Sequence, residues 1–332
     1  MKVAAVMGLP FHRWVLEPTV AALRESGHEV VEVVHQPRGP HDWLAVQDDT
    51  APAPLALRAA RADFVLTCEY PYEQLRTWAR ARVVTVRHSL ASRRNTWERE
   101  QGAADLLCRF GPWDVAELRR RGVAEQVQMV GGGCPWAEPV FSQPGGSTRA
   151  APGTLLWAPT WNTDLGCHTM VLNGLEQLAA DGWRIVVRPH GATRWRDPET
   201  MARMERVGSL DGAGAPWPAL AAADVVVTDV SGFALLAALP GVNAALLQVT
   251  PSEGALNGHR QHDPWGPEWR FRQKLGLESR RGQGLADMAR RLLEDDPCRA
   301  SRAAVGRLVA GNIDGANARL VADMEAAWEQ SG

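Results

Sequence analysis

Residues 183–191 read WRIVVRPHG, and this stretch indicates the fold class of the chain. Its apolar centre, 185–187, is typical of a buried strand, and Pro189 ends that strand because proline cannot donate a hydrogen bond to a sheet. The strand therefore carries Arg188 and His190 to its carboxyl end. In open parallel sheets ligands bind beyond the carboxyl ends of the strands, so the residues that follow each strand are the candidates for function.

Similar apolar runs alternate with helical patterns along most of the chain. The expected strands are KVAAVM, EVVEVV, DFVLTC, RVVTVR, DLLCRF and VQMV in the first half, and TLLWAP, WRIVVRP, ADVVVTD and NAALLQ in the second. Strands that alternate with helices form parallel sheets covered by helices on both faces. A chain of 332 residues is also too long for one ordinary core, which favours two domains.

Residues 141–153, FSQPGGSTRAAPG, are rich in glycine, proline and small polar side chains, which is typical of a linker. We therefore predict an α/β fold with two doubly wound domains, residues 1–145 and 146–300. Residues 301–332 are expected to form a helical tail packed across both domains, because apolar residues recur there at helical spacing.

The composition is that of a globular protein, with 45% apolar and 22% charged residues. The 36 basic and 38 acidic residues include no basic block, which argues against nucleic acid or an anionic membrane as the main partner. No run of about 18 apolar residues is present, so no transmembrane segment is expected. The N-terminal MKVAAVM fits a first strand better than a secretion signal, and five scattered cysteines without a CxxC pair favour reduced thiols. We therefore expect a cytoplasmic protein.

Two histidines follow apolar strands, one in each half of the chain. His88 follows RVVTVR and lies near Arg93, while His190 lies beside Arg188. A single histidine of this kind is more often structural. Two of them at strand ends, each near arginine, favour an anionic ligand between the domains, with one imidazole able to accept a proton near neutral pH. For Arg93 a solvated loop is an equally good interpretation.

The residues after ADVVVTD form a third candidate. Ser231 suits a helix N-cap, and Gly232 leaves the first turn open, so backbone N–H groups and the positive helix end would face a phosphate or diphosphate. Capping alone is an equally good interpretation of Ser231.

Several catalytic motifs are absent from the sequence. The chain has no GxxxxGK[ST] loop, no GxGxxG after its first strand and no GxSxG, which disfavours a P-loop ATPase, a dinucleotide-binding enzyme and a serine hydrolase. His259, His262 and Asp263 lie in a loop without the HExxH context of a zinc site. We expect no metal and no cofactor other than a nucleotide co-substrate.

Three stretches in order along the chain resemble one known family. LLWAPTWN (155–162), RPH (188–190) and ADVVVTDVSG (223–232) together are similar to the catalytic domain of the CDP-glycerol glycerophosphotransferases of teichoic acid synthesis. Three further segments stand where the family has other motifs, namely RHSLASRR (87–94), GCPWAEPVF (133–141) and NIDGANARLV (312–321). The resemblance implies a GT-B fold, in which two Rossmann-like domains face each other across a cleft. The N-terminal domain would bind the acceptor and the C-terminal domain the nucleotide donor.

The resemblance also implies roles for individual residues. His88 would be the general base on the acceptor, and His190 would neutralise the charge that develops on the donor phosphates. The donor would be bound by Arg188, Thr228, Asp229, Ser231, Gly232, Thr160 and Trp161. Asp314 would help to anchor the tail.

The sequence departs from the family pattern near the first histidine. Ser89 and Leu90 follow His88 where the family has Gly-Thr, and Arg93 replaces a lysine. Trp136 stands where the family has an arginine. These changes affect the region where an acceptor would bind.

Three of the 14 tryptophans lie in or just after these motifs, namely Trp97, Trp136 and Trp161. Core or interdomain packing is the commoner role of tryptophan. Their faces could instead stack on a nucleobase or hold a flat or cationic acceptor. Trp97 and Trp136, together with Arg93 and Asp314, are candidates for contacts with the acceptor or for support of the residues that make those contacts.

Three functions remain open on this basis. The first is a GT-B glycosyltransferase that moves a sugar from a nucleoside-diphosphate donor to a small acceptor of the specialised-metabolite type. The second is a CDP-glycerol-dependent glycerophosphotransferase that acts on a polymer or a lipid-linked acceptor. The third is a non-catalytic or sugar-nucleotide-isomerising relative. The absence of a basic amphipathic segment and the changes after His88 favour the first, whereas the family resemblance itself favours the second.

Overall fold

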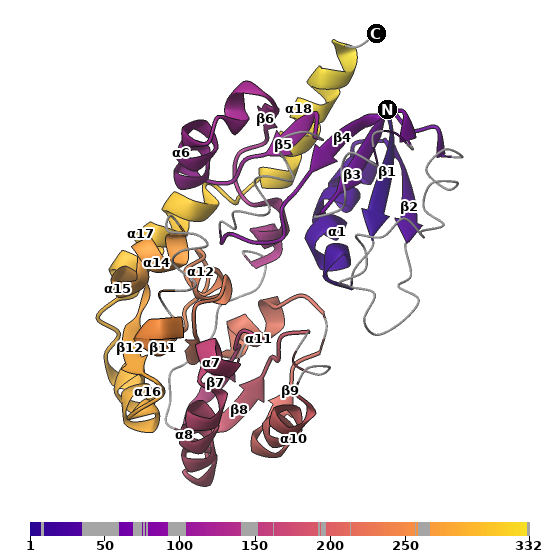
Figure 1. Ribbon diagram of the computed structural model, residues 1–332. Coiled ribbons are helices and arrows are strands. Elements are labelled where there is room, and N and C mark those ends of the chain that lie inside the picture. Colours follow the sequence, from indigo (N-terminus) through magenta and orange to yellow (C-terminus); the bar gives the residue numbers. More distant parts are fainter. Residues whose placement is uncertain are drawn as a thin grey trace. The chain divides into compact units, whose positions relative to one another are not determined.

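The computed structural model describes the residues 1–7, 10–34, 60–68, 75, 77, 79–91, 104–140, 152–161, 163–191, 193, 197–212, 214–255, 257 and 266–330. They form two compact units (Figure 1). Unit 1 takes its described residues from Met1–Ser89, Arg94–Pro139 and Leu308–Gly332, and unit 2 takes its own from Leu90–Arg93 and Val140–Arg307. Each unit is built around a parallel six-stranded sheet, which confirms the predicted α/β fold with two Rossmann-like domains.

The sheet of unit 1 has the strand order β2-β1-β3-β4-β5-β6. Its strands are β1 (Lys2–Met7), β2 (Glu29–Val34), β3 (Phe64–Thr67), β4 (Arg82–Thr85), β5 (Leu106–Cys108) and β6 (Gln128–Val130). The helical segments of this unit are α1 (Pro10–Glu25), α6 (Pro112–Arg120), the short 3₁₀ turns η1 (Val123–Glu125) and η2 (Pro135–Val140), and α18 (Ala316–Glu329). Every residue of β3 and β5 is buried, as expected for strands covered on both faces.

The sheet of unit 2 has the strand order β12-β11-β10-β7-β8-β9. Its strands are β7 (Thr154–Trp157), β8 (Arg184–Val187), β9 (Ser209–Leu210), β10 (Val225–Thr228), β11 (Ala245–Thr250) and β12 (Leu277–Arg280). The chain builds one side of the sheet from β7 outward to β9, and then returns to build the other side from β10 to β12. β7 and β10 are therefore parallel neighbours at the point where the strand order reverses.

Helices cover this second sheet. They are α7 (Thr163–Gly166), α8 (His168–Ala180), α10 (Pro198–Val207), α11 (Trp217–Ala222), α12 (Phe233–Leu236), α14 (Pro267–Arg270), α15 (Arg272–Leu275), α16 (Leu285–Glu294) and α17 (Arg299–Ala310). The apolar faces of α8, α10 and α16 share one core with β7, β8, β10 and β11. Two strands of this sheet, β9 and β12, were not predicted. β9 has only two residues, and β12 reads LESR, so neither presents an apolar run.

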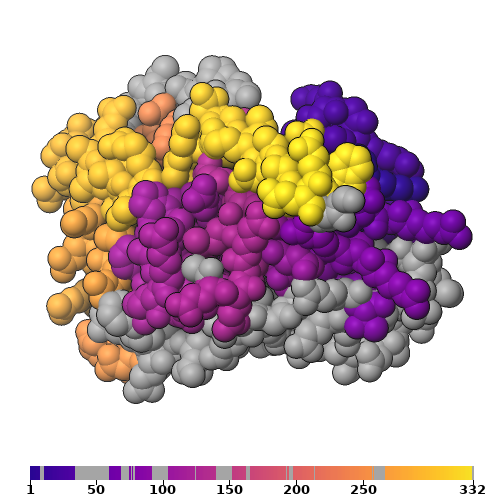
Figure 2. Space-filling view, turned by 90° about the horizontal axis from the view of Figure 1, so that it is seen from above, coloured from indigo at the N-terminus to yellow at the C-terminus, as the bar shows by residue number. Residues whose placement is uncertain are grey.

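Helix α18 packs on unit 1, although it follows unit 2 in sequence. Figure 2 shows it in yellow beside the purple and magenta residues of the same unit. The carboxylate of Glu138 accepts hydrogen bonds from the backbone N–H groups of Gly315 and Asn317, which begin the helix. The Asn317 amide also donates to the Pro135 carbonyl at 3.0 Å, and its oxygen accepts from the Thr19 hydroxyl at 2.8 Å. Buried polar groups thus hold the helix start in place.

The side chain of Asp314 does not provide this anchor, so that prediction is wrong. Asp314 is exposed, and its only hydrogen bond among those described is made by its backbone carbonyl, which accepts from Arg319. Glu138 and Asn317 perform the anchoring, because Glu138 accepts from the first N–H groups of the helix and the buried Asn317 amide donates to the Pro135 carbonyl. Among the described helices, none combines the length and the apolar character that crossing a membrane requires.

Candidate functional site

The carboxyl edge of the second sheet collects most of the predicted donor-binding residues. β7 leads into the loop 158–161, β8 into residues 188–190, and β10 into residues 229–232. Since β8, β7 and β10 are consecutive neighbours in the sheet, their carboxyl ends lie side by side. β7 and β10 flank the reversal of strand order, which is where ligands bind in folds of this class.

The backbone of Thr160 is held from two directions at this edge. Its N–H donates to Oδ2 of Asp229 at 2.7 Å, and its carbonyl oxygen accepts from Nε2 of His168 at 2.9 Å. The carbonyl oxygen can only accept, so Nε2 of His168 carries the proton. Asp229 follows β10, and His168 is the first residue of α8. The loop after β7 is therefore tied to both neighbouring elements.

Both of these side chains are buried, and burial dominates their ionisation. Burial raises the pKa of Asp229 to about 7, although the Thr160 N–H and the Arg272 guanidinium act in the opposite direction. Burial likewise lowers the pKa of His168, partly offset by its hydrogen bond to Thr160 and by the charge of Asp197. His168 is thus a neutral imidazole near pH 7, packed edge-on against the ring of Trp157 at 5.7 Å.

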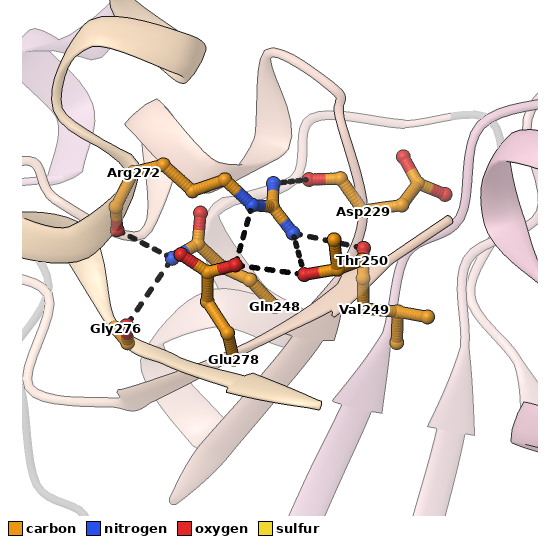
Figure 3. A network of polar contacts seen from close by, with 7 residues as sticks. All are labelled: Asp229, Gln248, Val249, Thr250, Arg272, Gly276 and Glu278. Carbon is orange, nitrogen blue, oxygen red and sulfur yellow. Dashed lines mark hydrogen bonds and ion pairs between the residues drawn. The ribbon is translucent and has the colours of Figure 1, made fainter. Parts of the chain in front are cut away.

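The buried guanidinium of Arg272 supports the loop that follows β10 (Figure 3). Arg272 donates to the backbone carbonyl oxygens of Asp229 at 3.4 Å and Val249 at 2.9 Å, and it pairs with Glu278 at 3.3 Å. Gln248 adds hydrogen bonds from its amide to the carbonyl of Arg272 at 2.7 Å and to that of Gly276. This network ties the ends of β10, β11 and β12 to helix α15, so the loop that carries Asp229 and Ser231 rests on a connected base.

Ser231 takes part in a chain of hydroxyl groups. The Thr228 hydroxyl donates to the carbonyl oxygen of Ala158 at 2.6 Å, and its oxygen lies 3.2 Å from that of Ser231. The Ser231 hydroxyl in turn accepts from the N–H of Phe233 at 3.0 Å. Ser231 therefore stabilises the turn that leads into α12, although Gly232 and not Ser231 occupies the N-cap position of that helix. The helix that it precedes, α12, has only four residues, so its dipole is small and phosphate binding here remains a prediction.

Thr228 itself is buried, and its hydroxyl joins β10 to the loop after β7. The Thr228 side chain therefore supports the backbone of that loop. Gly232 and Trp161 are half-buried residues of the same edge, where a ligand could reach them.

Arg188 and His190 follow β8 as predicted, but the arginine has a partner within its own unit. Its guanidinium forms an ion pair with Asp211 and donates to the carbonyl of Gly214. Asp211 follows β9, the strand that the sequence pattern did not reveal. A phosphate that bound Arg188 would therefore have to share the guanidinium with Asp211 or displace Asp211 from it. His190 is half-buried, and its carbonyl oxygen accepts from the N–H of Thr193.

In unit 1, His88 follows β4, and side-chain contacts hold the residue before it in place. The preceding residue, Arg87, is buried, forms an ion pair with Asp114 and lies over the ring of Phe110 at 4.6 Å. The ring of Phe11 lies 4.8 Å from that of His88. The same ring contacts His12 at 4.7 Å, a buried histidine that the sequence analysis did not single out.

Trp136 cannot stack on a ligand as proposed from the sequence, because it is fully buried. Its ring packs edge-on against Trp14 and Phe110, and its indole N–H donates to the carbonyl oxygen of Arg87 at 2.7 Å. An aromatic face must be accessible to bind a ligand, and these neighbours cover it. The side chain instead supports the backbone that precedes His88.

Some predicted residues lie outside the described part of the chain, namely Arg93, Trp97, His259, His262 and Asp263. Among the described residues, no group of three or more histidine, cysteine, aspartate or glutamate side chains is arranged to hold a metal ion. Sequence reasoning did not identify His168 or Arg272. Neither follows a strand or belongs to a short motif, so only the folded chain brings them to the sheet edge.

No protein-family model matches the chain, and no curated protein sequence matches it significantly. Several solved structures are similar over nearly the whole chain. A protein of Listeria monocytogenes assigned as a UDP-N-acetylglucosamine 2-epimerase has 13% identity and a TM-score of 0.64, with 99% of this chain and 97% of that chain covered. The wall teichoic acid polymerase TagF with CDPG has 9% identity and a TM-score of 0.63, with coverage of 99% and 89%.

A spinosyn rhamnosyltransferase, SpnG, complexed with thymidine diphosphate, has 15% identity and a TM-score of 0.55, with coverage of 98% and 100%. At such low identities the likeness defines the fold alone. The two parallel sheets and the match to most or all of the length of these structures show that the chain has the GT-B fold.

Proposed function

We propose that the protein is a GT-B glycosyltransferase that moves a sugar from a nucleoside-diphosphate donor to a small acceptor. The observation that carries this proposal is the meeting of Thr160, His190 and Ser231 at the carboxyl edge of one sheet, beside the reversal between β7 and β10. Folds of this class bind nucleotides at that position. The likeness to SpnG, which was solved with thymidine diphosphate, supports the same class of donor.

In this proposal unit 2 holds the donor. Ser231 and Gly232 lie nearest to the diphosphate, and His190 together with Arg188 offsets the charge that grows on it as the bond to the sugar breaks. Arg188 would exchange part of its contact with Asp211 for the phosphate. Trp161 lies next to the held backbone of Thr160 and is the aromatic candidate for stacking on the nucleobase. Basic side chains and backbone N–H groups would stabilise the leaving group, so the reaction needs no metal.

Unit 1 would provide the base. His88 would take the proton from the acceptor hydroxyl as that oxygen attacks the anomeric carbon, while the nucleoside diphosphate leaves with the bonding electron pair. The buried ion pair of Arg87 and the contact with Phe11 hold the histidine at the end of β4. We place the reaction in the cytoplasm, where nucleotide donors are available.

A glycerophosphotransferase is the second candidate. The order of the motifs APTW, RPH and TDVS favours it, and so does the likeness to TagF. In that reaction the acceptor attacks the phosphorus next to glycerol, the pyrophosphate bond breaks, and CMP leaves.

The released nucleotide separates these candidates. The protein would be incubated with CDP-glycerol and with UDP-, dTDP-, GDP- and ADP-sugars, together with a panel of small hydroxylated acceptors, and the nucleotides would be resolved by chromatography. Acceptor-dependent release of a nucleoside diphosphate supports the glycosyltransferase, and release of CMP supports the second candidate. Conversion of a sugar nucleotide into its epimer without release would contradict both.

A further inference from the structure

We propose that His168 and Asp229 are positioning residues that together hold the backbone of Thr160 and thereby set the place of the loop 158–161 at the donor site. This inference rests on the proposed function, because it assigns the held loop to donor binding. Neither side chain needs to touch the donor.

The two hydrogen bonds act on successive peptide groups. The N–H that donates to Asp229 belongs to the peptide before Thr160, and the carbonyl that accepts from His168 belongs to the peptide after it. Each peptide is planar, and only the φ and ψ angles of Thr160 lie between the two planes. Fixing both planes therefore fixes the direction in which the chain leaves Thr160, and with it the position of Trp161.

The beginning of the loop is also held, by β10. The N–H of Ala158 donates to the carbonyl of Val227 at 2.9 Å, and the carbonyl of Ala158 accepts from the Thr228 hydroxyl at 2.6 Å. β10 thus holds the loop through Val227, Thr228 and Asp229. The hydrogen bond from His168 to the Thr160 carbonyl comes instead from a different element, α8.

Gly166 packs closely against both side chains. A Cβ atom at Gly166 would lie 2.5 Å from Nε2 of His168 and 3.1 Å from Oδ2 of Asp229. A contact of 2.5 Å is shorter than real Cβ contacts and one of 3.1 Å is tight, so a side chain at Gly166 would displace the imidazole and crowd the carboxyl group. The edge-on ring of Trp157 covers the imidazole on another side. The holding contact is therefore specific in shape as well as in hydrogen bonding.

The arrangement is costly for stability. A carboxyl group buried at Asp229 loses its hydration, and its Oδ1 has no hydrogen-bond partner of normal geometry among the described residues. Nδ1 of His168 is likewise buried without such a partner. An apolar pair would pack there at lower cost. Costly buried polar groups that gather at a ligand-binding edge are typical of functional sites.

Two variants of His168 separate hydrogen bonding from packing. In His168→Gln the amide nitrogen can take the place of Nε2 and donate to the Thr160 carbonyl, whereas His168→Leu cannot donate. A third variant, Gly166→Ala, keeps every polar group and crowds both side chains with its added methyl group, which should disturb their hydrogen bonds to the loop. Ser279→Ala is the matched control, because it removes a buried hydrogen bond to the Gln283 carbonyl at the edge strand of the same unit.

Two measurements are made on each variant. The first is the hydrogen-exchange rate of the Thr160 amide, which reports the holding contact whatever the function of the protein. The second is the dissociation constant for the nucleoside diphosphate that binds the unaltered chain most tightly in a panel of UDP, dTDP, GDP, ADP and CDP. We expect His168→Leu and Gly166→Ala to speed the exchange and to weaken binding at least tenfold. His168→Gln should restore both, and Ser279→Ala should change neither.

Two results would overturn the inference. Unchanged exchange at Thr160 in His168→Leu and Gly166→Ala would show that the contact does not hold the loop. Faster exchange with unchanged nucleotide affinity would show that the held loop does not serve the donor. If no nucleoside diphosphate binds the unaltered chain, the proposed function fails, and the link to the donor falls with it. The exchange data would then still decide whether Thr160 is held. If His168→Leu does not fold, Gly166→Ala and His168→Gln give the same comparison.

Discussion

The indole N–H of Trp136 donates a hydrogen bond of 2.7 Å to the backbone carbonyl oxygen of Arg87. The next residue along the chain is His88, and the side chain of Arg87 is itself held by Asp114. A tryptophan that suggested ligand stacking in the sequence thus supports the backbone from which the candidate base projects.

Trp136→Phe should lower turnover without changing donor affinity. Phenylalanine keeps the aromatic packing against Trp14, but it leaves the Arg87 carbonyl without its donor, at a cost of about 1–3 kcal/mol. The resulting shift of His88 should reduce kcat, which steady-state kinetics would measure. Isothermal titration with the nucleotide is the control, and an unchanged kcat would remove Trp136 from the support of His88.

His88→Ala should reduce kcat by a factor of roughly 10²–10⁴, the usual contribution of a general base. Nucleotide affinity should stay within about twofold, because the donor residues of the proposal all belong to unit 2. Thermal denaturation would exclude a folding defect caused by losing the contact with Phe11. Loss of nucleotide binding in this variant would show that the role assigned to His88 is wrong.

Ser231→Ala should lower both stability and donor affinity. The hydroxyl accepts from the Phe233 N–H, so its removal should cost about 1 kcal/mol of unfolding free energy. If the same turn binds the diphosphate, the dissociation constant of the nucleotide should also rise roughly fivefold to tenfold, which calorimetry would detect. A loss of stability with unchanged affinity would show that Ser231 only stabilises this turn.

Asp229→Asn should change the pH dependence of stability. The pKa of this carboxyl is about 7 in the folded chain and 3.8 in its ordinary state, so folded Asp229 keeps a proton that the unfolded chain loses. Its contribution to stability is therefore fully present below about pH 4 and is lost as the pH rises through about 7. The asparagine variant should gain roughly 3 kcal/mol relative to the unaltered chain between pH 5 and pH 8.

Urea denaturation across that pH range would measure this gain. The Arg272 guanidinium, whose charge acts on Asp229, stays charged throughout this range. Asp224→Asn, which removes a carboxylate that accepts from the Thr154 N–H at the other end of β10, serves as the control. A stability difference that stays constant with pH would contradict the raised pKa.

Asn317→Asp should loosen helix α18 from unit 1. The new carboxylate would face the carboxylate of Glu138 and the carbonyl of Pro135, and it would lose the amide hydrogens that now bond to both. We expect a loss of about 3 kcal/mol and faster proteolytic cleavage near residue 315. Asp314→Asn, at an exposed position three residues earlier, should match the unaltered chain. Equal sensitivity of the two variants would contradict the anchoring role of Asn317.

Much of the fold followed from local patterns. Runs such as VVVT in 225–228 are rich in apolar residues because a central parallel strand is buried on both faces, and alternation with helices then implies parallel order. The strand LESR in 277–280 was not predicted, because it is not buried on both faces and therefore lacks an apolar run. It lies at the edge of its sheet, where polar residues are tolerated, so its sequence carries no apolar signal.

The sequence by itself determined the class of fold, the strand ends and the approach of Thr160, His190 and Ser231 to one edge, because periodicity and chain breakers are local properties. Only the tertiary structure decided what each side chain does there. It buried Trp136, paired Arg188 with Asp211, and brought His168 and Asp229 to the two sides of Thr160. Such contacts join residues far apart in the chain, and their energies depend on burial and geometry that exist only once the sheet and its helices have packed.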